Sequence, residues 1–357
     1  MKRLGALFLR GIFIFALLGI FVSGFETEAD AAVTRYSTDK AVKAELKSQI
    51  AERTSDDDIT VSIYLTKGKF TTYYNTRSKF KSLLQKAAIA NGVMYDEGSV
   101  TYYKSKYMIQ ATIDLADVYV VSTNAKFYKA AIEILQTRSF DKYIYYEGND
   151  DNAYEMIGAV YRQFPEYNTA LLSYAKKTVE GYTMVGFSMQ DGYTKSNLKS
   201  YYKSALNKAK SIISSEIDDS MTTDEEKVKA IHDYLCNNCK YVSSGDKLNY
   251  TAYGCLVNGE ATCQGYSGAF NMLLHLCGIR SIAITGKVSG TTNHAWNYAY
   301  VDGKYLYYDV TWDDDDTNSK ILTTYYGVDA SVIGKDHTFD STYTKYEKML
   351  KYSKYTF

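Results

Sequence analysis

The pattern of apolar and polar positions changes repeatedly along the chain, and each change predicts a new element. Residues 59–65 (ITVSIYL) alternate and are rich in β-branched side chains, which is typical of a strand. Residues 77–92 carry apolar side chains at helical spacing and end in Asn-Gly, so they predict a helix. Residues 100–113 predict a further strand and residues 124–138 an amphipathic helix. Because helices and strands mix without an internal repeat, residues 32–147 predict an α/β domain.

A second run of helix and strand signals begins near residue 150. Residues 181–189 (GYTMVGFSM) predict a strand and residues 195–217 a long helix. The next helix opens with Thr223 and Glu226 at the spacing of a capping box, in which each side chain bonds the backbone N–H of the other. Apolar positions on one face of that helix predict that it packs against a core.

The segment GEATCQGYSGAFNMLLHLCGI (259–279) places Cys263 at the start of a predicted helix. Tyr266, Phe270 and Leu273 recur at helical spacing, and Cys263 precedes Tyr266 by three residues, so the thiol continues the inward stripe. The first turn of a helix has unbonded backbone N–H groups and a dipole that favour an anion. A thiol at such a position is typical of reactive cysteines, so we predict that Cys263 is a nucleophile.

Two strand-like runs flank Asp302-Gly303, a dipeptide that favours a two-residue hairpin turn. With that turn the numbers of opposed residues sum to 605, so Trp296 opposes Asp309. By the same rule, His294 opposes Thr311. Side chains two apart share a face, which puts all four on one side of the ribbon and brings His294 within reach of Asp309.

Docking the cysteine helix on that face predicts a complete catalytic arrangement. Cys263 is the nucleophile, His294 the general base, and Asp309 the acid that fixes the imidazole tautomer. The imidazole takes the thiol proton, the sulfur attacks a carbonyl, and the backbone N–H of Cys263 helps to hold the oxyanion. Gln264 and Asn258 are the candidates for the second oxyanion donor.

Three segments resemble the bacterial branch of the transglutaminase-like superfamily, which shares the papain-like fold of thiol enzymes. They are EKVKAIHDYLCNNCKYV, AYGCLVNGEATCQGYSGAFNMLL and HAWNYAYVDGKYLYYDVTWDD. The resemblance extends over about residues 222–340 and places the family's catalytic positions on Cys263, His294 and Asp309. The two tryptophans, Trp296 and Trp312, also lie at positions typical of the family.

The resemblance implies an α+β fold in which a cysteine helix packs on an antiparallel sheet. Residues 148–357 are then a transglutaminase-like domain with an α/β lead-in and a core at 222–340, and residues 32–147 are an N-terminal domain of unknown role. The implied activity is attack on carboxamide or peptide bonds through a thioester, followed by hydrolysis, as in a protease or amidase, or by transfer to an amine. The alternative is a cell-surface binding or structural protein that keeps the fold without turnover. No cofactor and no metal is implied.

Other residues with chemical potential have several interpretations. Cys236, Cys239, Cys255 and Cys277 are compatible with buried thiols, with up to two disulfides, or with a zinc site that includes His232. The run Asp313–Asp316 predicts a solvated loop more than a calcium site, because it lacks the oxygen ligands at loop spacing that calcium needs. His337 stands where members of the family often carry histidine, and the sequence assigns it no role.

Residues 1–31 predict a cleavable secretory signal. Lys2, Arg3 and Arg10 precede the apolar run GIFIFALLGIFV, and Ala29-Asp30-Ala31 supplies a small-residue cleavage site. That run is short for a membrane span, which makes an N-terminal anchor the lesser alternative. We therefore expect a secreted or cell-surface protein that acts on a protein or peptide, such as a cell-wall peptide.

Composition narrows the function classes. The 357 residues carry 41 basic and 41 acidic side chains, so no basic excess favours binding to nucleic acid. A hydrophobic content of 46% predicts a globular chain. The chain has 37 tyrosines, which favour strands and amphipathic surfaces without naming a ligand. The oligomeric state is left open by these features.

Overall fold

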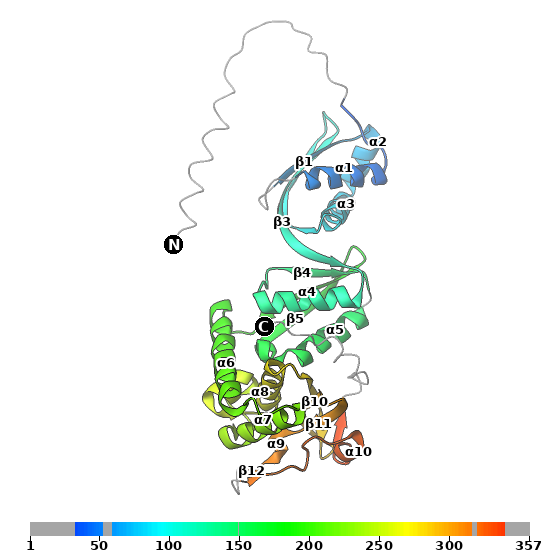
Figure 1. Ribbon diagram of the computed structural model, residues 1–357. Coiled ribbons are helices and arrows are strands. Elements are labelled where there is room, and N and C mark those ends of the chain that lie inside the picture. The colour runs from blue at the N-terminus through cyan, green and yellow to red at the C-terminus, as the bar shows by residue number, and fades with distance from the viewer. Residues whose placement is uncertain (1–32, 53–58, 149, 316–319, 340–357) are drawn as a thin grey trace, which may run out of the picture.

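The computed structural model describes residues 33–52, 59–148, 150–315 and 320–339 (Figure 1). It mixes helices with two main sheets, which confirms the α+β class. The predicted signal sequence lies outside the described residues. Among the described helices, none has the length and apolar content needed to cross a membrane.

The first elements are two layers, with helices packed on a sheet (Figure 1). In chain order they are α1 (Asp39–Ala51), β1 (Ile59–Tyr64), α2 (Lys67–Asn75), α3 (Arg77–Ile89), β2 (Val93–Tyr103), β3 (Met108–Val121), α4 (Asn124–Thr137) and β4 (Tyr143–Tyr146). The predicted strand at 59–65 and the predicted helices at 77–92 and 124–138 are confirmed. The single strand predicted at 100–113 is wrong. The chain reverses there between β2 and β3, and Tyr107 adopts a positive φ of 48° in the turn.

The first sheet has the strand order β1-β3-β4-β6-β5, with β2 also paired to β3. The early part of β3 pairs with β1 through contacts such as Ile109 opposite Ile63. Its last residues pair in parallel with β4, with Val120 opposite Tyr145. In turn β4 pairs with β6 (Tyr182–Met189). Hydrogen-bonded strands therefore lie on both sides of the predicted boundary at residue 147, which stays a prediction.

The later elements complete the first sheet with β5 and β6 and then form a second sheet with its helices. They are α5 (Asp150–Gln163), η1 (Pro165–Tyr167), η2 (Thr169–Leu171), β5 (Leu172–Val179), β6, α6 (Lys195–Glu216), α7 (Asp224–Asn238), β7 (Lys240–Tyr241), η3 (Lys247–Tyr250), η4 (Gly254–Asn258), β8 (Glu260–Ala261), α8 (Cys263–Leu276), β9 (Arg280–Val288), β10 (Thr292–Val301), β11 (Lys304–Tyr308), α9 (Val310–Asp313), β12 (Asp314–Asp315), β13 (Lys320–Ile321), α10 (Ala330–Ile333) and β14 (His337–Phe339). The second sheet is antiparallel throughout, in the order β11-β10-β9-β14.

The capping box and the hairpin turn form as predicted. Thr223 and Glu226 bond each other's backbone at the start of α7. Asp302 and Gly303 have φ of 45° and 82°, the left-handed values that a two-residue turn of this kind requires. Paired residues of β10 and β11 sum to 605, from Val301 opposite Lys304 to Asn297 opposite Tyr308.

The cysteine helix α8 begins at Cys263, as predicted. It is buried on all sides and not only along the predicted inward stripe. Every residue from 265 to 275 is buried, because α6, α7, β9 and β10 all pack around the helix. Its sequence is accordingly mostly apolar or small on every side, which is typical of a central helix, and its buried polar side chains Asn271 and His275 are hydrogen-bonded.

The helix packs on the sheet face opposite to the one predicted. The side chain of Asn297 donates from Nδ2 to the carbonyl of Ser267 in α8 (3.0 Å). Tyr308, directly opposite Asn297, contacts Phe270 of the helix with ring centroids 5.6 Å apart. Strand side chains alternate, so α8 covers the face of Asn297 and not the face of His294 and Trp296. The hydrophobic pattern allowed either face.

Candidate active site

Asp309 lies where strand β11 ends and the helical turn α9 begins. Its Oδ1 accepts the backbone N–H of Trp312 (3.2 Å), so the side chain caps that turn. Its own N–H donates to the carbonyl of Tyr325 (3.1 Å). The carboxyl group is fully buried, and the cap leaves Oδ2 to face the imidazole of His294.

The predicted opposition of Trp296 to Asp309 and of His294 to Thr311 is wrong. Strand pairing stops at Tyr308 because the cap turns the chain into α9, and Thr311 lies within that turn. The predicted register is right as far as Tyr308, so Asp309, the next residue, still lies beside His294 near the start of β10.

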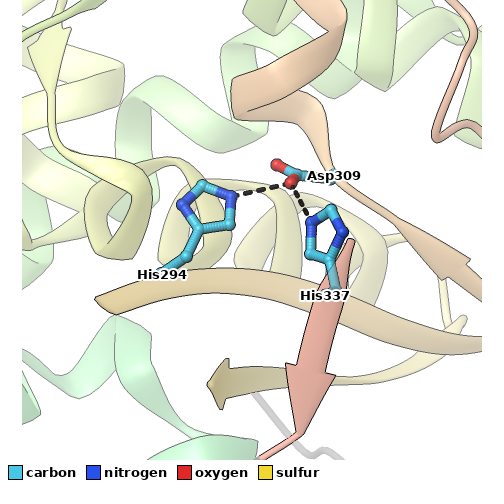
Figure 2. A group of neighbouring side chains, drawn as sticks. All are labelled: His294, Asp309 and His337. Atoms are coloured by element: carbon cyan, nitrogen blue, oxygen red, sulfur yellow. Dashed lines mark hydrogen bonds and ion pairs between the residues drawn. The ribbon is translucent and has the colours of Figure 1, made fainter. Parts of the chain in front are cut away.

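His294 and Asp309 are joined by a short hydrogen bond. His294 Nε2 lies 2.7 Å from Asp309 Oδ2, and only 6% of His294 is exposed (Figure 2). An ionised carboxylate only accepts hydrogen bonds, so His294 donates from Nε2. The other ring nitrogen, Nδ1, points away from Asp309 in Figure 2.

The electrostatics of the pair favour a charged histidine. Burial opposes protonation of the ring, but the hydrogen bonds with Asp309 and Cys263, together with their charges, raise the pKa of His294 to about 10. Burial also disfavours the charged form of Asp309 and by itself would raise the pKa of that carboxyl group. The hydrogen bonds from His294 and His337 outweigh burial and lower the pKa. Near neutral pH the site therefore favours an imidazolium beside a carboxylate.

Cys263 and His294 line the same cleft, which has a volume of about 600 Å³. Cys263 is half-buried at the first position of α8, and it is close enough to His294 to contribute to the raised pKa of that ring. Asp309 contacts the far side of the same ring. The structure therefore brings together all three predicted site residues. Of the two predicted oxyanion donors, Gln264 lines the cleft, whereas Asn258 is exposed and is not among the lining residues.

His337 is the site residue to which the sequence gave no role. It begins β14, is buried, and places Nε2 2.9 Å from Asp309 Oδ2 (Figure 2). Its Nδ1 lies 2.7 Å from Asp336 Oδ1. Burial opposes the ionisation of Asp336, but hydrogen bonds from Tyr325 and His337 lower its pKa. Both ring nitrogens of His337 therefore face carboxylate oxygens, one of Asp309 and one of Asp336.

Aromatic rings surround the two histidines. The His294 ring lies 5.6 Å from Trp312 and 6.0 Å from Trp296, between centroids. His337 contacts the same two indoles at 4.8 and 4.9 Å. The tryptophans limit access of water to the charged network and so strengthen its interactions. This gives a physical role to the two tryptophans that the sequence placed near the site.

The site also contains the donor set of a metal centre. Within the described part of the chain, His294, Asp309 and His337 are the one group of three such residues whose ligand atoms lie within 4.8 Å of one another. Ligand atoms around a tetrahedral zinc ion at about 2.0–2.2 Å would stand about 3.4 Å apart. Here Oδ2 is 2.7 and 2.9 Å from the two nitrogens, which are hydrogen-bond distances. The group is arranged as a charged hydrogen-bond network.

The other four cysteines lie away from this network, and all are free thiols in the structure. Burial raises the pKa of Cys277 to about 11 and that of Cys236 still further. Burial also raises the pKa of Cys255. The sulfur of Cys236 is 4.0 Å from His232 Nε2, but the described residues around this pair include no group of three potential ligands whose ligand atoms all lie within 4.8 Å of one another. Cys236, Cys255 and Cys277 are therefore disfavoured as nucleophiles at neutral pH.

The solvated loop predicted for Asp313–Asp316 is wrong for its first residues. Asp313 is fully buried, accepts the backbone N–H of Tyr325 (3.0 Å) and lies 3.3 Å from His232 Nε2. Asp314 accepts the hydroxyl of Tyr266 (2.5 Å). These carboxylates satisfy donors beneath α7 and α8, whereas Asp316 lies outside the described residues.

A half-buried cysteine at the start of a central helix, beside a histidine and an aspartate at the end of an antiparallel sheet, defines the papain-like class of folds. Within that class, residues 212–310 match the model of the Transglutaminase-like superfamily, so this part of the chain is a transglutaminase-like domain. This match confirms the predicted resemblance over residues 222–310.

Two curated relatives match this region. Kyphoscoliosis peptidase from Mus musculus is 27% identical over 121 residues, which cover 29% of this chain and 18% of the relative. The Homo sapiens protein of the same name is 28% identical over 105 residues, covering 25% of this chain and 16% of the relative. The chain thus spans less than a fifth of the length of either relative. A solved structure described as a TGase is 13% identical, with a TM-score of 0.31, and covers 73% of this chain and 80% of that one.

Proposed function

We propose that the chain is a thiol enzyme in which Cys263 attacks a carboxamide or peptide carbonyl. One observation carries the proposal. The His294 ring is hydrogen-bonded through Nε2 to Asp309 (2.7 Å) and lines one cleft together with Cys263, which contributes to its raised pKa. An imidazole held between a thiol and a carboxylate is the arrangement of a nucleophile, a base and an orienting group.

In the proposed mechanism His294 Nδ1 takes the proton of Cys263 and leaves a thiolate beside an imidazolium. Asp309 holds the reactive tautomer through the Nε2–H and stabilises the positive ring, in keeping with the raised pKa of His294. The thiolate bonds to the carbonyl carbon, and His294 returns the proton to the nitrogen that leaves. A thioester on Cys263 remains. Water or an amine then attacks it while His294 removes the incoming proton, and the thiol is regenerated.

The start of α8 supplies the proposed oxyanion site. Thr262, the N-cap residue, makes no side-chain cap bond, and its hydroxyl instead bonds the carbonyl of Asn249 (3.4 Å). The first-turn N–H groups, including that of Cys263, are therefore left to a ligand. Gln264 lines the cleft beside them, so we propose it as the second donor.

Selective alkylation tests the proposed nucleophile. Iodoacetamide at neutral pH is expected to modify Cys263 first, as located by mass spectrometry. The reaction should slow at least tenfold in His294→Ala, because the imidazole no longer promotes the thiolate form. Cys236→Ser is the matched control, since it removes a thiol whose burial raises its pKa and should leave the rate unchanged. Equal, slow labelling of all five thiols would support the non-catalytic binding or structural alternative.

A second experiment separates the two reaction outcomes. The protein is incubated with a glutamine-rich protein and a fluorescent amine, with Cys263→Ala as the control. Incorporation of the amine indicates transfer, whereas ammonia or new peptide termini without incorporation indicate hydrolysis. The name of the kyphoscoliosis peptidases favours testing peptide cleavage first. Export, based on residues 1–31, and a peptide of the cell wall as substrate belong to the same proposal.

A further inference from the structure

We propose that Arg162 makes a side pocket of the cleft into a binding site for a carboxylate group of the substrate. The inference rests on the proposed function, because it names the class of peptide that the thiol would attack. That class is a peptide with an acidic side chain, or a free C-terminal carboxylate, near the reacting amide.

The side pocket adjoins the thiol. It has a volume of about 250 Å³ and lies between α5 and β9. Gln264, Thr285 and Ala295 line both this pocket and the cleft that contains Cys263. The side pocket is therefore a neighbour of the cleft, and Gln264, the residue after Cys263, forms part of the wall that the two cavities share.

Arg162 supplies the charge. It stands near the end of α5, is only 9% exposed, and donates from Nη2 to Thr285 Oγ1 (2.8 Å). Thr285 pairs across the sheet with Ala295, which follows His294. Paired strand residues have Cβ atoms about 4.5–5.5 Å apart. The guanidinium is thus anchored on the strand next to the one that carries the proposed base.

The walls of both cavities match an anionic ligand. None of the described residues that line them is Asp or Glu, and Lys287, also in the cleft, adds a second cation. Tyr154, Tyr161 and Tyr174 line the side pocket and offer apolar contact to the rest of a peptide. A guanidinium stays charged at neutral pH, and its planar fork fits a carboxylate in two parallel hydrogen bonds.

Equilibrium binding to a Cys263→Ala protein tests the pocket without turnover. Four glutamine peptides are compared by fluorescence anisotropy: one with Glu beside the Gln, one with Gln in place of that Glu, and neutral peptides that end in a carboxylate or in an amide. We expect an acidic peptide to bind at least about tenfold more tightly than its neutral partner, as for a hydrogen bond to a charged group. The two pairs show whether the carboxylate comes from a side chain or from the chain end.

The variants isolate the guanidinium. Adding Arg162→Met should reduce the preference to within twofold, whereas Arg162→Lys should keep part of it. Arg280→Met is the matched control, because Arg280 packs on Tyr300 (4.4 Å) outside both cavities and should leave the preference unchanged. Should Arg162→Met fail to fold, Thr285→Val removes the anchor of the guanidinium and is expected to lower the same preference.

Alkylation of the native thiol gives an independent measurement. We expect the ratio of iodoacetate to iodoacetamide rates at Cys263 to fall at least about threefold in Arg162→Met, because only iodoacetate carries a carboxylate. Equal binding of acidic and neutral peptides, with Cys263 still reactive, would overturn the carboxylate pocket and spare the enzyme. Retained acidic preference in Cys263→Ala, with Cys263 inert to both reagents, would refute the thiol enzyme and leave the pocket standing.

Discussion

At the scale of single residues, one carboxylate organises the site. Oδ1 of Asp309 caps α9, while Oδ2 accepts hydrogen bonds from both His294 (2.7 Å) and His337 (2.9 Å). An unpaired buried carboxylate would be strongly destabilising, so these three donors are what allow Asp309 to remain ionised inside the protein. Asp336 is hydrogen-bonded to the other ring nitrogen of His337, Nδ1 (2.7 Å).

We predict that His337 holds this carboxylate in place. Replacement by Ala removes one hydrogen-bond partner from a buried carboxylate and should lower the free energy of unfolding by about 3 kcal/mol. His337→Gln should lose less, because the amide still donates to Asp309. Urea denaturation measures both, and a loss below about 0.5 kcal/mol in His337→Ala would contradict the role, since that is the range of neutral surface changes.

The raised pKa of His294 predicts a pH dependence of stability. The folded value is about 10 against an ordinary 6.5, so the folded protein binds the proton more tightly. The stabilisation is complete below about pH 6.5 and is lost as the pH rises toward 10. Urea denaturation from pH 6 to 10 should therefore show a steeper decline in wild type than in His294→Gln. Parallel curves would mean that the imidazole gains no proton affinity on folding.

At the scale of elements, the sequence predicted those features that depend on residues close together in the chain. The Asp302-Gly303 turn fixed the pairing of β10 with β11, and the residues before Cys263 marked the start of α8. The face on which α8 packs and the end of β11 at Tyr308 were not predictable in the same way. They depend on Tyr325 and on the neighbouring helices, which are distant in sequence.

The hairpin turn also caps a helix, which predicts a stability effect. Asp302 accepts the backbone N–H groups of Asp224 (3.0 Å) and Glu225 (3.1 Å) at the start of α7. Asp302→Ala should cost about 1–2 kcal/mol, because it removes these caps and puts a less suitable residue at a positive φ. Asp302→Asn, which tolerates that φ and still accepts a hydrogen bond, should cost clearly less. Thermal unfolding of the two variants makes the comparison, and equal losses would show that the caps contribute nothing.

At the scale of the whole molecule, the site depends on segments far apart in sequence. His337 on β14 joins the network, and the sequence marked its position without giving it a role. Arg162 on α5 lines the side pocket, and no sequence motif pointed to it. The long strand β3, which joins β1 and β2 to β4, was missed for a related reason. Alternation in sequence does not reveal where an extended chain changes partners.

A buried polar link joins the lead-in to the cysteine helix. Glu166 in η1 is fully buried and lies 3.0 Å from His275 Nδ1 of α8. It also accepts a hydrogen bond from Asn271 Nδ2 (3.2 Å), and this amide bonds the carbonyl of Gln163 as well (2.9 Å). Because Arg162 belongs to the same segment, the link fixes the cleft wall relative to the proposed nucleophile.

We predict that breaking this link destabilises the candidate active site and the lead-in together, because the two unfold as one cooperative unit. Glu166→Ala removes the buried carboxylate that faces His275 and accepts a hydrogen bond from Asn271, so we expect a loss of about 3–5 kcal/mol. Trp296 and Trp312, the two tryptophans of the chain, report on the site by fluorescence, while circular dichroism reports on the whole chain. Both urea transitions should shift together in Glu166→Ala and stay in place in Glu133→Ala, an exposed control on α4. A tryptophan transition that stays in place while circular dichroism shifts would mean that the lead-in unfolds independently and does not support the site.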